Sequence, residues 1–302
     1  MIPAPAKPAW IAVDWGTSNL RAWAMDADNN VIDHAKSDDG MSRLKPDQFE
    51  PALLKIIQIW LKPEPTKIIA CGMVGSRQGW AEAPYRATPC AAQTDTTIKA
   101  PAHDNRLDVR LIPGIKQNNP ADIMRGEETQ IAGYLAQNPN FDGILCLPGT
   151  HSKWVHISAG EIVSFRTFMT GELFALLATQ SVLRHSVAAV GHDDTAFNDA
   201  ISETISRPET LAAHLFSIRA NALLHDQSPE IARARLSGLL IGAELAAAKP
   251  YWLGQNITLI GAPSLTASYA TALTGQGVAP TIAQGDAMTL NGLAAARATL
   301  KD

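Results

Sequence analysis

Two apolar runs joined by a tight, hydroxyl-rich turn constrain this chain more than any other stretch of its sequence. Residues 11–25 read Ile-Ala-Val-Asp-Trp, then Gly-Thr-Ser-Asn, then Leu-Arg-Ala-Trp-Ala-Met. This pattern predicts a β-hairpin that begins with a buried strand. Gly16 lets the backbone turn close to a ligand, while Thr17 and Ser18 offer hydroxyls and successive backbone N–H groups. The turn is therefore a candidate phosphate cradle, the alternative being an ordinary hairpin with an Asx-type turn.

Asp14 stands at the carboxyl end of the first expected strand. Its negative charge would repel a phosphate in direct contact, so we expect this carboxylate to hold Mg²⁺ through water, as is usual for this ion beside a nucleotide. Asp14 is therefore the candidate metal residue of the chain.

Two later segments repeat parts of this arrangement. Residues 144–157 again place a Gly-Thr turn between two apolar runs, and residues 257–265 form an apolar run that ends in Gly-Ala-Pro-Ser and continues as a helical pattern. A helix N-terminus directed at a ligand suits its flat or anionic part. The candidate ligand-binding residues of these segments are Gly149, Thr150, His151, Ser152, Lys153, Gly261, Ala262 and Ser264.

Composition narrows the class of protein. With 302 residues, of which 46% are hydrophobic, the chain is long enough for two packed domains. A net charge of -4 without a basic run argues against nucleic-acid partners, and no stretch approaches the roughly 20 apolar residues of a membrane span. Three cysteines without Cys-x-x-Cys spacing predict reduced thiols, no zinc site and a cytoplasmic protein. No P-loop, zinc-protease or esterase signature occurs.

Apolar periodicity predicts an α/β chain with a change of domain near Pro139. The segment from Gly171 to about Leu240 is rich in Ala and Leu, and we expect an inserted helical subdomain that shapes a ligand pocket or an oligomer contact. Its scattered histidines lack the clustering of a metal site. The further expected elements are helices at 46–61, 122–137, 264–273 and 287–300, strands at 67–70, 109–112, 144–147 and 257–260, and a glycine-rich loop at 72–80.

Five blocks of the sequence, at 13–21, 71–80, 124–130, 147–154 and 167–173, follow one another in an order typical of one family. They resemble the 2-dehydro-3-deoxygalactonokinase family of the sugar kinase, Hsp70 and actin superfamily. The resemblance implies two ribonuclease H-like (actin-like ATPase) domains, 1–139 and 140–302, with a cleft between them and a helical insertion at about 172–240. Many superfamily members carry an Asp in the second phosphate strand, whereas here Pro148 precedes Gly149, so the catalytic carboxylate must lie elsewhere.

The same resemblance implies a function. It is the transfer of the ATP γ-phosphoryl group, with Mg²⁺, to the terminal 6-hydroxyl of 2-dehydro-3-deoxy-D-galactonate in galactonate catabolism. The partners would be ATP and a small sugar acid, with no nucleic acid and no membrane, and a homodimer is compatible with the pattern. The alternatives are a related kinase for another sugar or keto-sugar acid, a polyphosphate hydrolase of the same superfamily, and an ATP-driven binding module like Hsp70.

The resemblance also locates the catalytic base. Sugar kinases of the superfamily commonly carry a Gly-Asp pair at a helix start just before the second phosphate motif, where this chain has Gly126-Glu127-Glu128. Related exopolyphosphatases carry Gly-x-Glu-Glu in a similar place, which leaves the register ambiguous by one residue. Glu127 is our first choice and Glu128 our second, against the alternative of a solvated Glu pair on a helix flank.

A sugar acid carries a carboxylate, and its binding site needs a cation or several N–H donors. Arg77 and Arg166 are the candidates, each with an ordinary surface arginine as its alternative. Trp80 is expected to stack against the carbon chain, Lys153 to neutralise phosphate charge and His151 to donate to a phosphate oxygen. The expected substrate-binding residues are Arg77, Ser76, Trp80, Arg166, Thr167 and Thr170.

Overall fold

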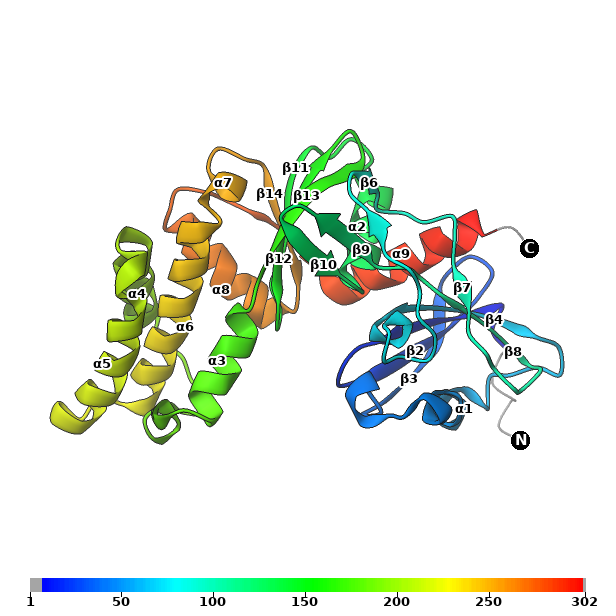
Figure 1. Cartoon of the computed structure of the whole chain (residues 1–302), viewed down its shortest axis with the longest axis horizontal. Coiled ribbons are helices and arrows are strands. Elements are labelled where there is room, and N and C mark those ends of the chain that lie inside the picture. The colour runs from blue at the N-terminus through cyan, green and yellow to red at the C-terminus, as the bar shows by residue number, and fades with distance from the viewer. Residues whose placement is uncertain (1–6, 301–302) are drawn as a thin grey trace. The chain divides into compact units, whose positions relative to one another are not determined.

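A computed structural model describes residues 7–300, which form two compact units (Figure 1). Unit 1 holds residues 7–141, 158–164 and 285–300, and unit 2 holds residues 142–157 and 165–284. We expected the domain boundary between residues 139 and 140, and the chain first passes from unit 1 to unit 2 between residues 141 and 142. The chain also returns to unit 1 at 158–164 and again at 285. The second return follows from the helix that begins at 285, which packs in unit 1.

A six-stranded sheet forms the centre of unit 1, in the order β3-β2-β1-β4-β8-β7. Strand β1 is antiparallel to β2 and parallel to β4. Almost all of its residues are buried, because helix residues 49–57 pack on one of its faces and helix residues 293–296 on the other. A small second sheet has the order β10-β9-β5. The strands are β1 (Trp10–Trp15), β2 (Leu20–Met25), β3 (Val31–Ser37), β4 (Thr66–Gly72), β5 (Arg86–Ala87), β6 (Cys90–Ala91), β7 (Ile98–Lys99), β8 (Leu107–Leu111), β9 (Ile115–Asn118) and β10 (Ala121–Met124).

The helices of unit 1 pack on this sheet and on one another. Helix α1 buries Phe49, Leu53 and Ile57 in the core, and it ends at Ile57, earlier than the expected 61. The helices are α1 (Phe49–Ile57), α2 (Glu127–Gln137) and α9 (Gly285–Thr299), with single 3₁₀ turns η1 (Met41–Arg43), η2 (Pro46–Gln48) and η3 (Met73–Gly75).

The start of α2 corrects one sequence prediction. We expected a helix from Asp122, but residues 121–124 form strand β10, which pairs antiparallel with β9. Gly126 has a φ of 108°, a left-handed conformation that a helix cannot contain and that glycine adopts at little cost. The helix therefore begins at Glu127, immediately after this glycine.

Helices α2 and α9 approach each other so closely that their backbones touch. A Cβ added to Gly133 would lie 2.0 Å from the carbonyl oxygen of Met288, and one added to Gly292 would lie 1.9 Å from that of Thr129. No side chain other than hydrogen fits at either position, and the two helices are held at a fixed crossing. The position of α9 is therefore tied to that of α2.

Unit 2 repeats the strand pattern of unit 1. Its strands belong to a six-stranded sheet with the order β6-β13-β12-β11-β14-β15, in which β11 is antiparallel to β12 and parallel to β14, as β1 is to β2 and β4. This duplication confirms the expected α/β class with two ribonuclease H-like halves. The strands are β11 (Gly143–Leu147), β12 (Ser152–Ser158), β13 (Glu161–Phe168), β14 (Ile257–Gly261) and β15 (Thr281–Gln284).

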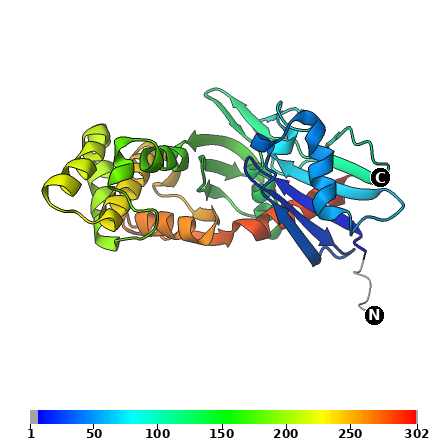
Figure 2. The same cartoon turned by 90° about the horizontal axis from the view of Figure 1, so that it is seen from below.

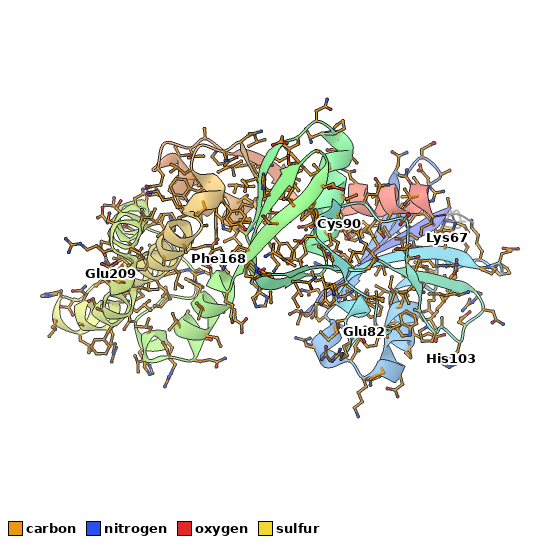
Figure 3. The ribbon with its side chains drawn as sticks, turned by 45° about the horizontal axis from the view of Figure 1, so that its top comes forward. Lys67, Glu82, Cys90, His103, Phe168 and Glu209 are labelled. Carbon is orange, nitrogen blue, oxygen red and sulfur yellow. The ribbon has the colours of Figure 1, made fainter. Side chains whose placement is uncertain are left out.

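Helices fill the rest of unit 2, and α3 to α6 run side by side beyond the sheet (Figures 1 and 2). Phe168, at the end of β13, packs against the core between sheet and helices (Figure 3). These helices occupy the stretch that we expected to be an insertion. The helices are α3 (Thr170–Thr179), α4 (Asp194–Ser206), α5 (Leu211–Leu224), α6 (Pro229–Ala247), α7 (Lys249–Trp252) and α8 (Pro263–Thr274), with 3₁₀ turns η4 (Val182–His185) and η5 (Pro208–Thr210).

Two features are absent from residues 7–300. No helix in this range is long and apolar enough to cross a membrane. Within the same range, no group of three or more His, Cys, Asp or Glu side chains is placed to hold a metal ion.

Candidate active site

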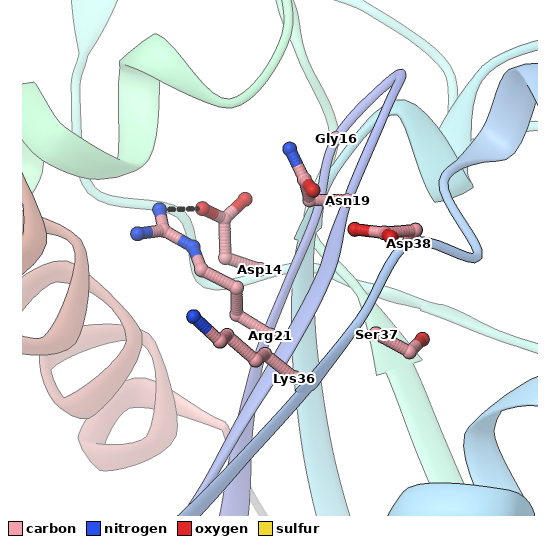
Figure 4. A pocket seen from close by; sticks show the side chains of 7 residues that line it. All are labelled: Asp14, Gly16, Asn19, Arg21, Lys36, Ser37 and Asp38. Atoms are coloured by element: carbon pink, nitrogen blue, oxygen red, sulfur yellow. Dashed lines mark hydrogen bonds and ion pairs between the residues drawn. The ribbon is translucent and has the colours of Figure 1, made fainter.

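Three charged side chains form a row across the neighbouring strands β1, β2 and β3 of unit 1. Asp14 lies directly opposite Arg21, and Arg21 lies directly opposite Lys36. Together with the turn that starts at Gly16, they line a cavity of about 520 Å³ (Figure 4). The cavity is completed by Asn19, Ser37 and Asp38. A carboxylate, two cations and a glycine turn thus meet at one opening.

Arg21 joins two carboxylates in this row. Its guanidinium donates hydrogen bonds to Asp14 and, over 2.6 Å, to Oδ1 of Asp286 at the start of α9. Partial burial acts to lower the pKa of Arg21, but the charge of Asp14 and these hydrogen bonds raise it above its usual value. Arg21 is therefore a fixed positive charge at the mouth of the cavity.

The turn between β1 and β2 is held from outside the hairpin. The Gly16 N–H donates to the carbonyl of Asn19 over 2.9 Å, which closes the turn. The carbonyls of Gly16 and Thr17 accept bonds of 3.0 Å from the N–H groups of Met41 and Ser42. Ser18 is exposed at the tip. Contacts from residues 40–42 thus fix the conformation of the expected phosphate cradle.

The carboxyl ends of β1 and β4 bring Asp14 near the start of α2. Asp14 pairs in register with Cys71, whose Sγ lies 3.8 Å from Oδ1 of Asp14. The Cys71 thiol is buried, and its pKa is raised by that burial and by the charges of Asp14 and Glu128. A Cβ on Gly126 would lie 3.4 Å from the Cα of Gly72. The expected metal carboxylate and the expected base region therefore adjoin the same strand end.

Glu127 and Glu128 occupy different environments. Glu128 is fully buried, and its carboxylate accepts bonds from the Gly126 N–H (2.6 Å) and the Thr129 hydroxyl (3.1 Å). Burial, followed by the neighbouring charge of Glu127, raises the pKa of Glu128 to about 7. Glu127 is only partly buried and accepts a bond from the backbone N–H of Arg125. Of the two carboxylates, only Glu127 is reachable by solvent.

The glycine-rich loop after β4 separates its expected binding residues. Arg77 is exposed and forms a 3.6 Å ion pair with Glu82. Trp80 is 8% exposed, and its ring stacks on Phe49 with centroids 6.5 Å apart, so it belongs to the core of unit 1. Ser76 is buried. Of the expected set in this loop, Arg77 is the side chain that faces solvent.

A buried arginine lies beneath this loop. Arg125 is 8% exposed, donates to the carbonyl of Ala83 over 2.8 Å and stacks on the ring of Tyr85 at 4.3 Å. Among residues 7–300, its Nε and Nη1 and the Oγ of Ser76 are buried polar atoms without a hydrogen-bond partner. Nη1 lies 3.0 Å from the position of a Cβ on Gly75, so these donors surround the start of the loop. Such groups are costly unless something anionic or polar meets them.

In unit 2 the second Gly-Thr turn packs against the start of α3. The Glu172 N–H donates to the carbonyl of Thr150 (2.9 Å), and Glu172 Oε2 lies 2.5 Å from Nε2 of His151. Lys153 is buried, with Nζ 3.4 Å from the carbonyl oxygen of His151. Ser152 is also buried and shares a 2.9 Å hydrogen bond with Tyr269. The side chains of 152 and 153 therefore support the turn from its buried side.

A second cavity, of about 480 Å³, opens in unit 2. It brings together three expected ligand-binding residues, Gly149, Ala262 and Ser264, from the two Gly turns that end β11 and β14. Helix α6 contributes Arg233, whose guanidinium lies 4.9 Å over the ring of Phe174. The cavity is lined by Gly149, Thr170, Gly171, Phe174, Gly191, His192, Arg233, Ser237, Leu240, Ile241, Ala262, Ser264, Leu265, Ser268 and Tyr269.

The remaining expected substrate residues lie in unit 2. Arg166 is exposed on β13, and Thr167 follows it with partial burial. Thr170 is buried at the first position of α3, lines the second cavity and donates its hydroxyl to Glu244. Gly261 ends β14, where a Cβ would lie 3.3 Å from the carbonyl oxygen of Pro148. The structure therefore groups Thr170 with the nucleotide candidates.

Sequence reasoning did not select four charged residues that the structure adds: Lys36, Arg125, Asp286 and Glu244. Lys36 sits on an exposed edge strand that the sequence reading left out, and its strand register alone brings it beside Arg21. Asp286 comes from 265 residues further along the chain than Arg21. The one usable signal was the Glu within the apolar pattern of α6, a position where an unpaired charge is costly.

This chain is similar in sequence and in fold to known proteins. A protein of Rhizobium meliloti strain 1021, described as a 2-dehydro-3-deoxygalactonokinase, is 39% identical over 95% of this chain and 96% of its own. The 2-dehydro-3-deoxygalactonokinase of Escherichia coli K12 is 35% identical over 92% and 93%. The crystal structure of a protein from Sinorhizobium meliloti, described in the same way, matches with a TM-score of 0.89 at 40% identity over 96% and 98%.

A more distant likeness supports the fold alone. The activator of 2-hydroxyisocaproyl-CoA dehydratase from Clostridium difficile, solved with ADPNP, has a TM-score of 0.54 at 12% identity over 96% of this chain and 95% of its own. The model of the 2-keto-3-deoxy-galactonokinase family matches residues 14–296, a span that begins at Asp14 and includes every candidate residue named above. The chain belongs to the 2-keto-3-deoxy-galactonokinase family.

Proposed function

We propose that this protein is an ATP-dependent kinase that transfers the γ-phosphoryl group of ATP to the terminal 6-hydroxyl of 2-dehydro-3-deoxy-D-galactonate, in galactonate catabolism. The family match over residues 14–296 is the observation that carries the proposal. The duplicated strand pattern, with a Gly-Thr turn in each half, supports it, because both turns lie at the carboxyl end of a central strand.

Mg²⁺ fits the residues around Asp14. Mg²⁺ in nucleotide sites is usually held by one or two carboxylates, with water and phosphate oxygens as the other ligands. Asp14 and Asp38 both line the 520 Å³ cavity, which has room for such a hydrated ion. When bound, the ion would neutralise charge on the transferring phosphate. Asp14 holds it through water, Arg21 donates to a phosphate oxygen, and the backbone of Gly16, Thr17 and Ser18 binds the phosphates.

The 480 Å³ cavity of unit 2 is the proposed nucleotide site. The turn at Gly149–Lys153 binds phosphate, chiefly through backbone N–H groups, because the side chains of Ser152 and Lys153 are buried behind it. The turn at Gly261, Ala262 and Ser264 leads into the N-terminus of α8 and faces the adenosine. The cavity is lined by apolar side chains, such as Phe174 and Leu240, together with a few polar groups, a combination that is typical of a small-molecule site.

Glu127 is the proposed general base. It accepts the proton of the acceptor hydroxyl as that hydroxyl attacks the γ-phosphorus. Its partial exposure supports this role, whereas both carboxylate oxygens of Glu128 already accept hydrogen bonds within the buried turn before α2. Glu128 then fixes the position of the helix start.

The carboxylate of the sugar acid is bound by Arg77 or by Arg166. Both side chains are exposed, and both lie beside candidate hydroxyl groups, Ser76 for the first and Thr167 for the second. The partnerless donors of Arg125 and Ser76 around Gly75 support an anion near the first of these sites.

An ADP-release assay with a panel of acceptors tests the function. The panel contains 2-dehydro-3-deoxy-D-galactonate, its D-gluconate epimer, D-galactonate and glucose, and product analysis by mass spectrometry and ³¹P NMR locates the phosphate. We expect the highest kcat/KM with the galactonate derivative and a 6-phosphate product. ADP release that is equal with and without acceptor would contradict the kinase proposal and favour a hydrolase.

Two further expectations follow from this role. An enzyme that consumes ATP for sugar-acid breakdown is expected in the cytoplasm, which fractionation would test. A homodimer remains a prediction, and light scattering after gel filtration measures it.

A further inference from the structure

Unit 2 contains a buried carboxylate that the phosphoryl-transfer chemistry above does not use. Glu244 lies on α6 and is 3% exposed. Three side chains donate to it: Trp154 through Nε1 to Oε1 (2.8 Å), Tyr269 through its hydroxyl to Oε2 (2.7 Å), and Thr170 through its hydroxyl to Oε2. A buried charge is costly unless hydrogen bonds compensate it. Burial raises the pKa of Glu244 above its usual value, and the three hydrogen bonds offset part of that effect.

The three donors come from three elements that are distant in the sequence. Trp154 belongs to β12, Thr170 is the first residue of α3, and Tyr269 lies in the middle of α8. A fourth side chain, Ser152, has its hydroxyl 2.9 Å from the Tyr269 oxygen. Glu244 therefore joins the second Gly-Thr hairpin to the helices that follow β13 and β14.

The direction of these bonds is determined by the donors' chemistry. An indole N–H only donates, and an ionised carboxylate only accepts. Because Tyr269 gives its proton to Glu244, the Ser152 hydroxyl donates to the Tyr269 oxygen. Trp154, Thr170 and Tyr269 thus donate to one carboxylate, and the Ser152 proton is used in the hydrogen bond to Tyr269.

Two of the donors are also walls of the 480 Å³ cavity. Thr170 and Tyr269 line it, as does Gly171 next to Thr170. A Cβ on Gly171 would lie 2.3 Å from the carbonyl oxygen of Gly149, so the start of α3 lies directly against the turn. Glu244 itself does not line the cavity. It acts on the cavity only through side chains that do.

We propose that Glu244 is a positioning residue for the nucleotide: it sets the start of α3 and the middle of α8 against the Gly149 turn, in the arrangement that binds ATP. This rests on the proposed function. Its specific content is that the charge of Glu244 determines ATP affinity, whereas the binding of the sugar acid does not depend on it.

The test is Glu244→Gln, which keeps the shape of the side chain but offers an amide N–H₂ where three donors need acceptors. We expect KM for ATP and the Kd for ADP to rise about tenfold or more, the effect of leaving buried donors partly unpaired. KM for the sugar acid is expected to change less than about twofold, within the noise of such comparisons. The Kd is measured by calorimetry on protein whose folding has been checked by circular dichroism.

A matched control is Glu203→Gln. Glu203 is a carboxylate of the neighbouring helix α4, forms a 2.7 Å ion pair with Arg235 and does not line the cavity. This variant is expected to lose some thermal stability with KM for ATP unchanged. Tyr269→Phe removes one donor while the charge stays, and a rise in KM for ATP of about fivefold, smaller than that of Glu244→Gln, is expected.

The outcomes separate the inference from the function on which it rests. If Glu244→Gln folds and binds ADP like the wild type, the inference is wrong, whatever its stability. If that variant does not fold, Tyr269→Phe decides, and an unchanged KM for ATP in that variant overturns the proposal. Failure of the wild-type protein to phosphorylate any sugar acid would instead refute the proposed function.

Discussion

The carboxylate of Asp14 is hydrogen-bonded to the guanidinium of Arg21, the residue directly opposite it on the neighbouring strand. Any cation that Asp14 holds must therefore either share this carboxylate with Arg21 or displace the Arg21 guanidinium from it. If Asp14 holds Mg²⁺ as proposed, Arg21 adds a second positive charge where phosphate oxygens would lie. In that case metal binding and phosphate binding would be coupled through one ion pair.

Asp14→Asn tests the metal role. The variant keeps the shape of the side chain but loses the charge, so kcat should fall by on the order of 10² or more while the fold survives. Steady-state rates across a Mg²⁺ titration and a thermal melt measure both effects. Asp38→Asn, from the same cavity, serves as the comparison and should do less. Near wild-type turnover of Asp14→Asn at saturating Mg²⁺ would rule out the role.

Arg21→Lys tests whether the guanidinium is needed in addition to its charge. A lysine ammonium cannot present the planar fork with which Arg21 contacts two carboxylates and, as proposed, phosphate. Loss of a charged hydrogen bond of about 1.5–3 kcal/mol predicts a fall of roughly 10- to 100-fold in kcat/KM for ATP. Asp286→Asn removes only the more exposed partner, and less than about a fivefold change is expected. Equal kinetics for Arg21→Lys and wild type would leave Arg21 as a strand-bridging residue only.

Glu127→Gln and Glu128→Gln together assign the base. Removal of a general base typically costs 10² to 10⁴ in rate, so Glu127→Gln should lower kcat by about that range with both KM values little changed. Glu128→Gln should do less. A larger fall in kcat for Glu128→Gln than for Glu127→Gln would assign the base to Glu128 instead. A fall in kcat of less than about tenfold in both variants would mean that no general base is needed and that positioning of the substrates alone explains the rate, as a loose transition state permits.

The raised pKa of Glu128 predicts a pH dependence of stability. The folded protein retains the Glu128 proton up to about pH 7, whereas the unfolded chain releases it near 4.5. The folded state then binds more protons, so the free energy of unfolding falls as pH rises between these values, by on the order of 3 kcal/mol. Urea unfolding of wild type and Glu128→Gln at pH 4.5, 6 and 8 measures the difference. Wild type should lose stability relative to the variant across this window and no further above it; a constant difference would contradict the prediction.

Arg77→Ala and Arg166→Ala identify the group that holds the substrate carboxylate. Loss of a bidentate pair of roughly 1.5 to 3 kcal/mol should raise KM for the sugar acid and leave KM for ATP unchanged in one of the two variants. Steady-state kinetics with each substrate varied in turn separates these effects. Should KM for the sugar acid stay unchanged in both, Arg125→Lys becomes the next variant, and backbone N–H groups the remaining explanation.

Local pattern was enough to predict the two hairpins, because a buried central strand needs a continuous apolar run and its turn needs small residues. The helix expected from Asp122 was wrong, since a glycine with positive φ is invisible to periodicity. We expected Trp80 to bind ligand, whereas its ring packs in the core against Phe49. The local sequence does not distinguish a ligand-binding tryptophan from a core tryptophan.

Long-range partners were beyond the sequence for a different reason. Strand register places Lys36 beside Arg21, and the tertiary fold places Asp286 and Glu244 against theirs. Such pairings depend on contacts that no local pattern encodes. The candidate turns could thus be predicted, whereas the charges that hold them could not.

The backbone contact between α2 and α9 has a consequence for biosynthesis. Helix α9 covers Trp10, Ala12 and Cys71 of the first-made sheet and meets α2 at two glycines. During translation, unit 1 therefore lacks one of its layers, and Arg21 lacks Asp286, until residues 285–299 have left the ribosome. A nascent chain that already contains all the candidate residues for binding phosphate and the sugar acid still has an incomplete active site. Catalytic competence is expected only after α9 has been made, because α9 completes unit 1 and follows all the other candidate residues in the chain.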